Sequence, residues 1–166
     1  MRPLNFLLLV LGFMVLQSTA LNLVAIRGIK PDLVLVLVIL HGFFRGTREG
    51  AFWGFVGGVI QDLAGGGYFG IYALTNMTGG YLAGLGEGRL YRDNRVITAG
   101  LTWLCTFFAQ LVYFLLLLVV EVRVNMLTAL VDIIIPVSMY NALVVLLFYG
   151  FYYRTRRRGL VADGEY

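Results

Sequence analysis

Residues 42–70 read GFFRGTREGAFWGFVGGVIQDLAGGGYFG. Four-residue spacing separates the glycines Gly42, Gly46, Gly50, Gly54 and Gly58. The next position of this series is Asp62, and Gly66 and Gly70 continue it. On a helix, a step of four returns to nearly the same face. A face without side chains lets a second backbone approach closely, as in the small-xxx-small contacts of membrane helices. The stretch therefore predicts a tightly packed helix with one acid, Asp62, on its glycine stripe.

Composition places this stretch in a membrane protein. Of the 166 residues, 60% are hydrophobic and 13% are charged, and the mean hydropathy is +0.84. A soluble domain is about 45–50% apolar and roughly 25% charged. The net charge of +4 does not indicate nucleic-acid binding, because the basic residues flank apolar segments, where membrane topology places them. We predict an all-α, polytopic membrane protein that contacts membrane lipids and no nucleic acid.

Six apolar segments are expected to form six transmembrane helices. They cover about residues 4–25, 31–44, 50–65, 68–86, 96–120 and 126–152. The second and third are short against the roughly 20 residues of a normal span. They either span a locally thinned bilayer or are partly re-entrant, and we favour two short spans. Residues 1–153 form the predicted transmembrane domain, and residues 154–166 form a short basic cytoplasmic tail.

The arginines predict that both termini are cytoplasmic. With the N-terminus inside, ten arginines fall on the cytoplasmic side: Arg2, Arg45, Arg48, Arg89, Arg92, Arg95, Arg154, Arg156, Arg157 and Arg158. Only Arg27, Lys30 and Arg123 fall outside, which agrees with the positive-inside rule. The first segment also resembles a signal peptide with small residues near Ala20, but its apolar run continues past that point, which favours a retained helix.

Polar residues at the segment edges predict where helices begin. Asp32, after Pro31, suits the positive end of the second helix. Thr47 is expected to cap the third helix, and Asn94 and Asn125 are expected to cap the fifth and sixth.

The acids of the apolar segments sort to the outer side in this topology. Asp32, Asp62 and Asp132 lie there at a depth similar to that of Arg27 and Arg123, and we predict an outer polar cluster of these five residues. Ionisable groups within a membrane are costly and are functional candidates by default. Asp62 either caps a helix or pairs with an outer arginine, or else faces a partner or ligand. Asp132 has the same alternatives, with more weight on burial among the helices.

The glycine stripe has two interpretations that do not exclude each other. It packs helices within the chain, or it accepts a partner's helix. The candidate residues are Gly50, Gly54, Gly57, Gly58, Asp62, Gly70, Tyr81 and Gly84. Catalysis is not expected, because one histidine (His41) and one cysteine (Cys105) cannot form a metal set and offer no nucleophile–base pair. We predict no catalytic, cofactor-binding or metal-binding residues.

Residues 31–88 resemble a known family. The resemblance rests on Pro31-Asp32-Leu33-Val34-Leu35, Arg45-Gly46-x-x-Glu49-Gly50, Gly54-Phe55-x-Gly57-Gly58, Gln61-Asp62-Leu63, Gly70-Ile71-Tyr72-Ala73-Leu74 and Gly80-Tyr81-Leu82-Ala83-Gly84. This pattern is similar to the rod shape-determining MreD family. The matched motif positions are Pro31, Asp32, Gly50, Gly54, Asp62, Gly70, Tyr81 and Gly84.

The resemblance implies a function that composition alone does not. The resemblance implies a non-enzymatic scaffold of the elongasome in the bacterial cytoplasmic (inner) membrane. Such a scaffold binds the transmembrane helix of MreC and organises lateral peptidoglycan synthesis. The resemblance also implies links of this protein and MreC to MreB, RodA and a class B penicillin-binding transpeptidase. It also implies a fold similar to the S component of energy-coupling-factor transporters. The alternative is therefore a small-molecule-binding transporter subunit, although the first segment lacks the Ala-x-x-x-Ala face usual in S components.

Overall fold

The described part of the chain is a helical bundle. The structure is a computed structural model that describes residues 3–19, 29–88, 94–122 and 125–157. Its elements are α1 (Pro3–Thr19), α2 (Leu33–Arg45), α3 (Thr47–Gly65), α4 (Ile71–Gly84), α5 (Arg95–Val119), α6 (Met126–Ala129), the π-helical η1 (Leu130–Ile134) and α7 (Ile135–Arg157). The segments α6, η1 and α7 follow one another without a break. The six apolar segments of the sequence thus correspond to six helical segments, which confirms the all-α prediction.

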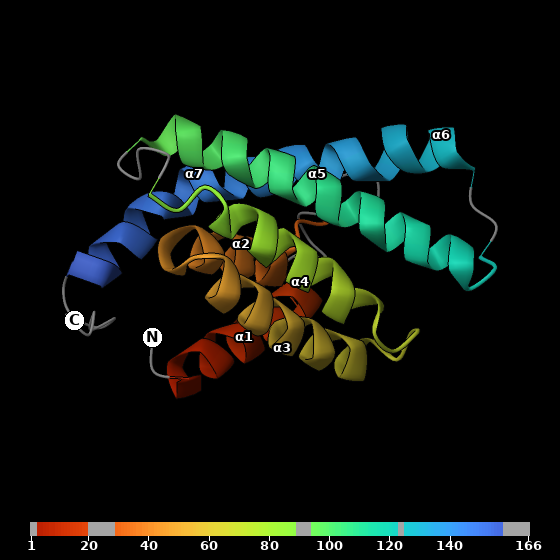
Figure 1. Ribbon diagram of the computed structural model, residues 1–166, viewed down its shortest axis with the longest axis horizontal. Helices are drawn as coiled ribbons and strands as arrows, with labels where there is room; N and C mark the ends of the chain where they lie inside the picture. The colour runs from red at the N-terminus through yellow and green to blue at the C-terminus, as the bar shows by residue number, and fades with distance from the viewer. Residues whose placement is uncertain (1–2, 20–28, 89–93, 123–124, 158–166) are drawn as a thin grey trace.

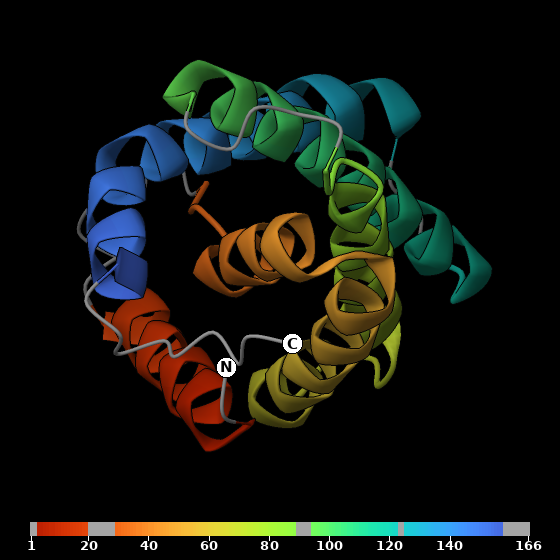
Figure 2. The same ribbon diagram turned by 60° about the vertical axis from the view of Figure 1, so that its left-hand side comes forward.

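Helix α2 forms the centre of the bundle. Figure 2 shows it enclosed by α1, α3, α4, α5 and α7. Every residue from Leu33 to Phe44 is buried. The sequence explains this position, because LVLVLVIL has no polar face and a helix that is apolar all round belongs in a core. At 13 residues the helix is about 20 Å long, and protein rather than lipid surrounds it.

The helices alternate in direction along the long axis (Figure 1). One end of the bundle holds the start of α1, the junction of α2 with α3, and the end of α7. The other end holds the connection from α3 to α4 and the start of α6. Arg45 and Arg48 lie at the first end, at the junction of α2 with α3, and Lys30 precedes the opposite terminus of α2. This arrangement has the alternation that the sequence predicts.

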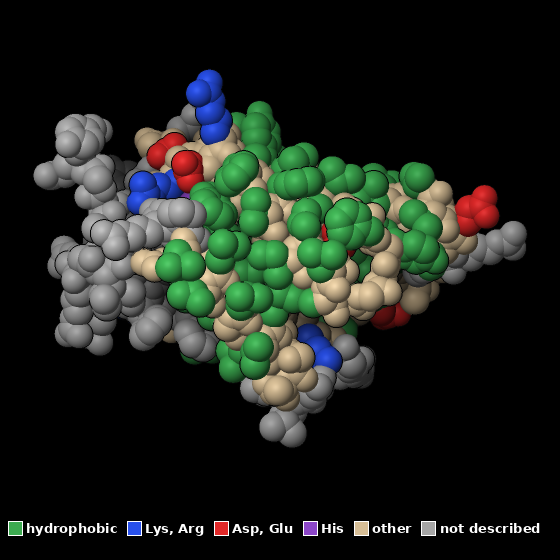
Figure 3. Space-filling model, turned by 90° about the horizontal axis from the view of Figure 1, so that it is seen from below, with side chains coloured by type: hydrophobic (Ala, Val, Ile, Leu, Met, Phe, Trp, Pro, Cys, Tyr) green, Lys and Arg blue, Asp and Glu red, His purple; other side chains and the backbone are tan. Residues whose placement is uncertain are grey.

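Two helical segments are long and apolar enough to cross a bilayer. They are α5, with 25 residues, and Met126–Leu147, with 22. Leu4–Thr19 and Leu33–Arg45 are apolar but shorter. Figure 3 shows a face on which hydrophobic side chains cover much of the middle and most of the described charged side chains lie toward the edges. Exposed side chains of this kind include Leu8, Val15, Leu104, Leu115, Leu143 and Leu147. Such a surface suits lipid better than water.

Helix starts agree with the sequence at two of the three predicted caps and at Asp32, which was expected at the positive end of the second helix. Asp32 is the N-cap of α2, and the side chains of Asn94 and Asn125 cap α5 and α6. The prediction for Thr47 was wrong, because Thr47 is already helical and Gly46 takes the N-cap position without a side-chain bond. The single residue between α2 and α3 must reverse the chain, and Gly46 does so with a φ of +94°, which favours glycine.

Candidate functional site

The glycine stripe of α3 packs directly against the backbone of α4. A Cβ on Gly50 would collide with the carbonyl oxygen of Gly80. One on Gly54 would collide with the carbonyl of Asn76, and one on Gly58 with that of Tyr72. Three successive turns of α3 therefore approach α4 at backbone distance, which no larger residue permits. In the described structure, these positions are occupied by the chain's own helix.

Glycines outside α3 complete this contact. A Cβ on Gly42, at the end of α2, would also meet the carbonyl of Gly80, so that three helices meet there. Gly84 lies against the backbone of Thr47 at the start of α3. A Cβ on Gly57 would meet Val34 Cγ1 of α2 at 3.4 Å, an ordinary contact distance. Although Gly42 lies outside α3, it belongs to the same close contact.

A buried carboxylate, Asp32, connects three helices to the start of α2. Asp32 Oδ1 accepts hydrogen bonds from Leu35 N at 3.0 Å, from Gln61 Nε2 of α3 at 3.2 Å and from Gln17 Nε2 of α1 at 3.4 Å. The backbone N of Asp32 donates to Asn141 Oδ1 of α7 at 2.9 Å. Each of these groups would be costly to bury alone. Together they allow the central helix to begin inside the protein.

The network extends from Asp32 to α4 and α5. Gln61 Oε1 accepts a hydrogen bond from Asn76 Nδ2 of α4. Asn141 Nδ2 donates to Thr106 Oγ1 of α5 at 3.4 Å. Asn76, Thr106 and Asn141 are each fully buried. Polar side chains of α1, α3, α4, α5 and α7 are thus joined around the N-terminus of α2, and we call this group the Asp32 network.

Asp62 has a capping role across the connection from α3 to α4. Its carboxylate accepts the backbone N–H groups of Gly70 at 2.9 Å, Tyr72 at 3.0 Å and Ala73 at 3.1 Å. The first turn of a helix has N–H groups with no intrahelical partner, and a carboxylate also suits its positive dipole end. Gly70 takes a φ of +99° at the N-cap of α4, and it carries the chain into this geometry.

The outer polar cluster is not assembled as a unit in the described residues. Asp32 and Asp62 are buried at the same end of the bundle, but through separate sets of partners. Asp132 is exposed on η1, so its expected burial among the helices was wrong. Arg27 and Arg123 lie outside the described residues. Tyr81, a motif position, is 49% exposed on α4.

The sequence analysis did not identify the amide side chains of the Asp32 network. Gln17, Asn76 and Asn141 were not singled out, and Gln61 appeared only as part of a family motif. The signal was present, because side-chain amides inside apolar segments need internal partners where water is absent. The sequence could not pair them, since Asp32 and Asn141 lie 109 positions apart.

A second polar group lies at the opposite end of α2. His41 is 1% exposed and its Nε2 lies 3.5 Å from Glu49 Oε2, without a hydrogen bond. Glu49 Oε2 instead accepts from Trp53 Nε1 at 2.9 Å. The His41 ring packs edge-on against Phe6, with 5.0 Å between ring centroids. This environment is that of a packed aromatic side chain.

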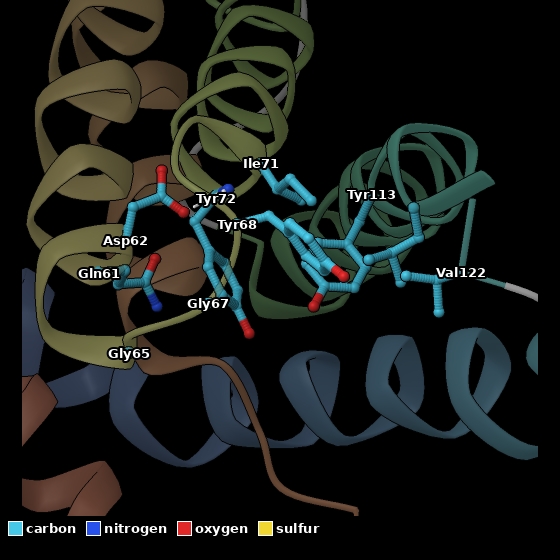
Figure 4. A pocket seen from close by; sticks show the side chains of 10 residues that line it. Gln61, Asp62, Gly65, Gly67, Tyr68, Ile71, Tyr72, Tyr113 and Val122 are labelled. Carbon is cyan, nitrogen blue, oxygen red and sulfur yellow. Dashed lines mark hydrogen bonds between the residues drawn. The ribbon is translucent and has the colours of Figure 1, made fainter. Parts of the chain in front are cut away.

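A cavity of about 320 Å³ opens next to Asp62. Figure 4 shows that its walls come from the end of α3, the start of α4 and the later turns of α5. Three tyrosines line it, Tyr68, Tyr72 and Tyr113, together with Gln61 and Asp62 and the apolar Ile71, Leu117 and Val122. Within the described residues, no group of three His, Cys, Asp or Glu side chains could hold a metal ion.

These features define a class: a helical membrane protein whose polar interior holds its helices together. The family model for rod shape-determining protein MreD matches residues 2–155, nearly the whole chain. The chain therefore belongs to the MreD family, which confirms the resemblance seen in residues 31–88. No curated protein and no solved structure matches the chain. Family membership assigns it a general role in determining rod shape.

Proposed function

We propose that this chain is a non-enzymatic scaffold of the bacterial elongasome that binds the transmembrane helix of MreC and organises lateral peptidoglycan synthesis. The MreD family match is the observation that carries the proposal. The close contact of α3 with α4 and the Asp32 network support it, because they make a rigid body on which partners can be positioned. Indirect links to MreB, RodA and a class B penicillin-binding transpeptidase belong to the same proposal.

The proposed location is the cytoplasmic membrane, crossed six times, with both termini in the cytoplasm. The alternating helices support this topology, as does the position of Arg45 and Arg48 at the terminus of α2 opposite Lys30. The fold-level similarity to S components is part of the proposal.

Labelling of single cysteines tests the topology. In a chain with Cys105→Ala, Gly67→Cys should react with a membrane-impermeant maleimide in intact cells. Glu87→Cys, at the other end of the bundle, should react only after lysis. Both positions are exposed, so accessibility within the protein is matched. Reaction of Glu87→Cys in intact cells would contradict the proposed orientation.

We place the MreC contact on exposed side chains outside the glycine stripe. Gly54 and Gly58 lie against α4, so a second helix could reach them only if α4 moved away. Exposed apolar side chains are available on several helices, for example Leu8 on α1, Phe55 on α3 and Leu147 on α7.

Photocrosslinking tests this placement. A photoreactive residue is placed at Leu8, Phe55, Leu104 or Leu147, one position at a time. Positions on the face that binds MreC should give a crosslink, and positions on the opposite face should give none. Gly54 is a poor position for the probe, because the new side chain would disrupt the fold. If a folded, membrane-inserted protein gives no MreC crosslink from any exposed helix, the scaffold proposal loses its central contact.

The alternative function is a small-molecule-binding subunit of a transporter. The cavity beside Asp62 is the observation that favours it. Co-purification is the discriminating measurement: an energising partner subunit with the chain would favour the transporter, whereas MreC would favour the scaffold.

A further inference from the structure

The cavity beside Asp62 contains an aromatic arrangement that the scaffold function does not use. Tyr72 and Tyr113 lie with their ring centroids 5.2 Å apart and their planes inclined at 45°. Tyr68, from the connection before α4, completes the group and is 53% exposed. Figure 4 shows the three side chains arranged around the same space between α4 and α5. We call it the tyrosine cavity.

The charge on the cavity wall is negative. Among the lining residues that the structure describes, Asp62 is the only one with a charged side chain, and it is acidic. The face of an aromatic ring is also negative, because of its quadrupole. An anion would therefore be repelled by this wall, whereas a cation would be attracted by both the carboxylate and the rings.

Two polar groups of the wall, Gln61 and Asp62, use their hydrogen bonds within the protein. Gln61 already donates to Asp32 and accepts from Asn76. Asp62 accepts three backbone N–H groups. Their hydrogen-bonding capacity is largely used, so recognition would depend on ring faces and on charge. Aromatic cages recognise quaternary and other organic ammonium groups by this means, within about 6 Å of a ring centroid.

We propose that the tyrosine cavity binds an organic ammonium group, held by the faces of Tyr68, Tyr72 and Tyr113 and by the charge of Asp62. The volume of about 320 Å³ is at the lower end of the roughly 300–1,000 Å³ of small-ligand sites. It therefore accommodates a head group rather than a whole lipid. The ammonium group belongs either to a lipid head group or to a free small amine.

The first test compares two probes of the same shape. Choline and 3,3-dimethylbutan-1-ol differ in that a positive nitrogen of the first is a neutral carbon in the second. Binding to the purified full chain in a neutral maltoside detergent is measured by calorimetry. We expect choline to bind at least tenfold more tightly than the alcohol. Equal affinities, or no binding of choline by folded protein, would overturn the proposal.

Variants locate the binding to the cavity. Tyr68→Leu should weaken choline binding at least fivefold, whereas Tyr68→Phe, which keeps the ring face, should stay within about twofold of the wild type. Tyr68 is half-exposed, so neither change threatens the fold. Tyr81→Leu, an exposed tyrosine of α4 outside the cavity, is the matched control and should leave binding unchanged. Unchanged binding in Tyr68→Leu would contradict the assignment.

A third experiment identifies the source of the ammonium group. The chain is placed in nanodiscs of phosphatidylethanolamine or of phosphatidylglycerol, and choline binding is measured in each. Weaker choline binding in the ethanolamine lipid would support a lipid head group as the natural occupant, because it competes for the cavity. Equal binding in both would support a free amine. Absence of binding in both lipids would count against the proposal.

Discussion

Gln61 Nε2 donates a hydrogen bond to Asp32 Oδ1 at 3.2 Å across 29 positions of sequence. This bond joins the glycine-striped helix α3 to the start of the central helix α2. Both residues are 9% exposed, so water contributes little to satisfying them. The glycine contacts set the distance between helices, and the Asp32 network fixes their rotation and register.

Removal of Gln61 from the network should destabilise the protein. Gln61→Leu removes a partner of Asp32 and leaves Asn76 Nδ2 without its acceptor. A buried unsatisfied group costs about 1–3 kcal/mol, and we expect a lower midpoint of thermal unfolding in detergent. The double variant Gln61→Leu/Asn76→Leu should recover part of the loss, because both polar partners are then absent. Asp132→Asn is the exposed control, and an equal loss there would contradict the role of the network.

Addition of one methyl group to the glycine contact should destabilise it. Gly50→Ala places a Cβ against the Gly80 carbonyl, so α3 must move from α4. Overpacking of this kind costs about 1–3 kcal/mol. Gly100→Ala in α5 is the matched control, since nothing lies within 4 Å of its Cβ position. There we expect a gain of about 0.5–1 kcal/mol from helix propensity. Thermal unfolding of the two variants should therefore shift in opposite directions.

Loss of the Asp62 cap should loosen the start of α4. Asp62→Ala leaves the N–H groups of Gly70, Tyr72 and Ala73 without their acceptor, at a cost of about 0.5–2 kcal/mol. Hydrogen exchange should accelerate at these amides. Asn125→Ala, which uncaps α6 at an exposed site, should leave exchange in α4 unchanged. Unaltered exchange in Asp62→Ala would show that the cap does not hold this turn.

His41 is predicted to act through packing. Its Nε2 is buried without a hydrogen bond, and its ring lies against Phe6. His41→Phe keeps the ring and removes the unsatisfied nitrogen, so stability should be maintained or improved. His41→Ala leaves a cavity and should cost about 3–5 kcal/mol, as for other buried rings. Loss of stability in His41→Phe comparable to that in His41→Ala would instead assign a role to the imidazole nitrogens.

The limits of sequence-based prediction are clearest at α2 and at Asp62. The apolar run from Leu33 to Leu40 predicted a helix, and its lack of a polar face is consistent with its place at the centre of the bundle. It is predicted to be a short span, and the structure adds that other helices of the chain surround it. The sequence left Asp62 between capping and partner binding, because the N–H groups that donate to its carboxylate could be assigned only once α4 had a position. The prediction that Thr47 caps α3 was wrong by one residue, because Gly46, where the chain reverses, is the N-cap.

The sequence alone determined the membrane class, the helices, the glycine stripe and the alternation of charge at the segment ends. These properties depend on local periodicity and composition, which neighbouring residues carry. Only the tertiary structure decided that α4 covers the stripe, that Asp32 meets Gln17, Gln61 and Asn141, and that three tyrosines surround one cavity. Hydrogen bonds and ring contacts act over a few ångströms, and the partners come from helices far apart in the chain. Their pairing therefore exists only once the helices are packed.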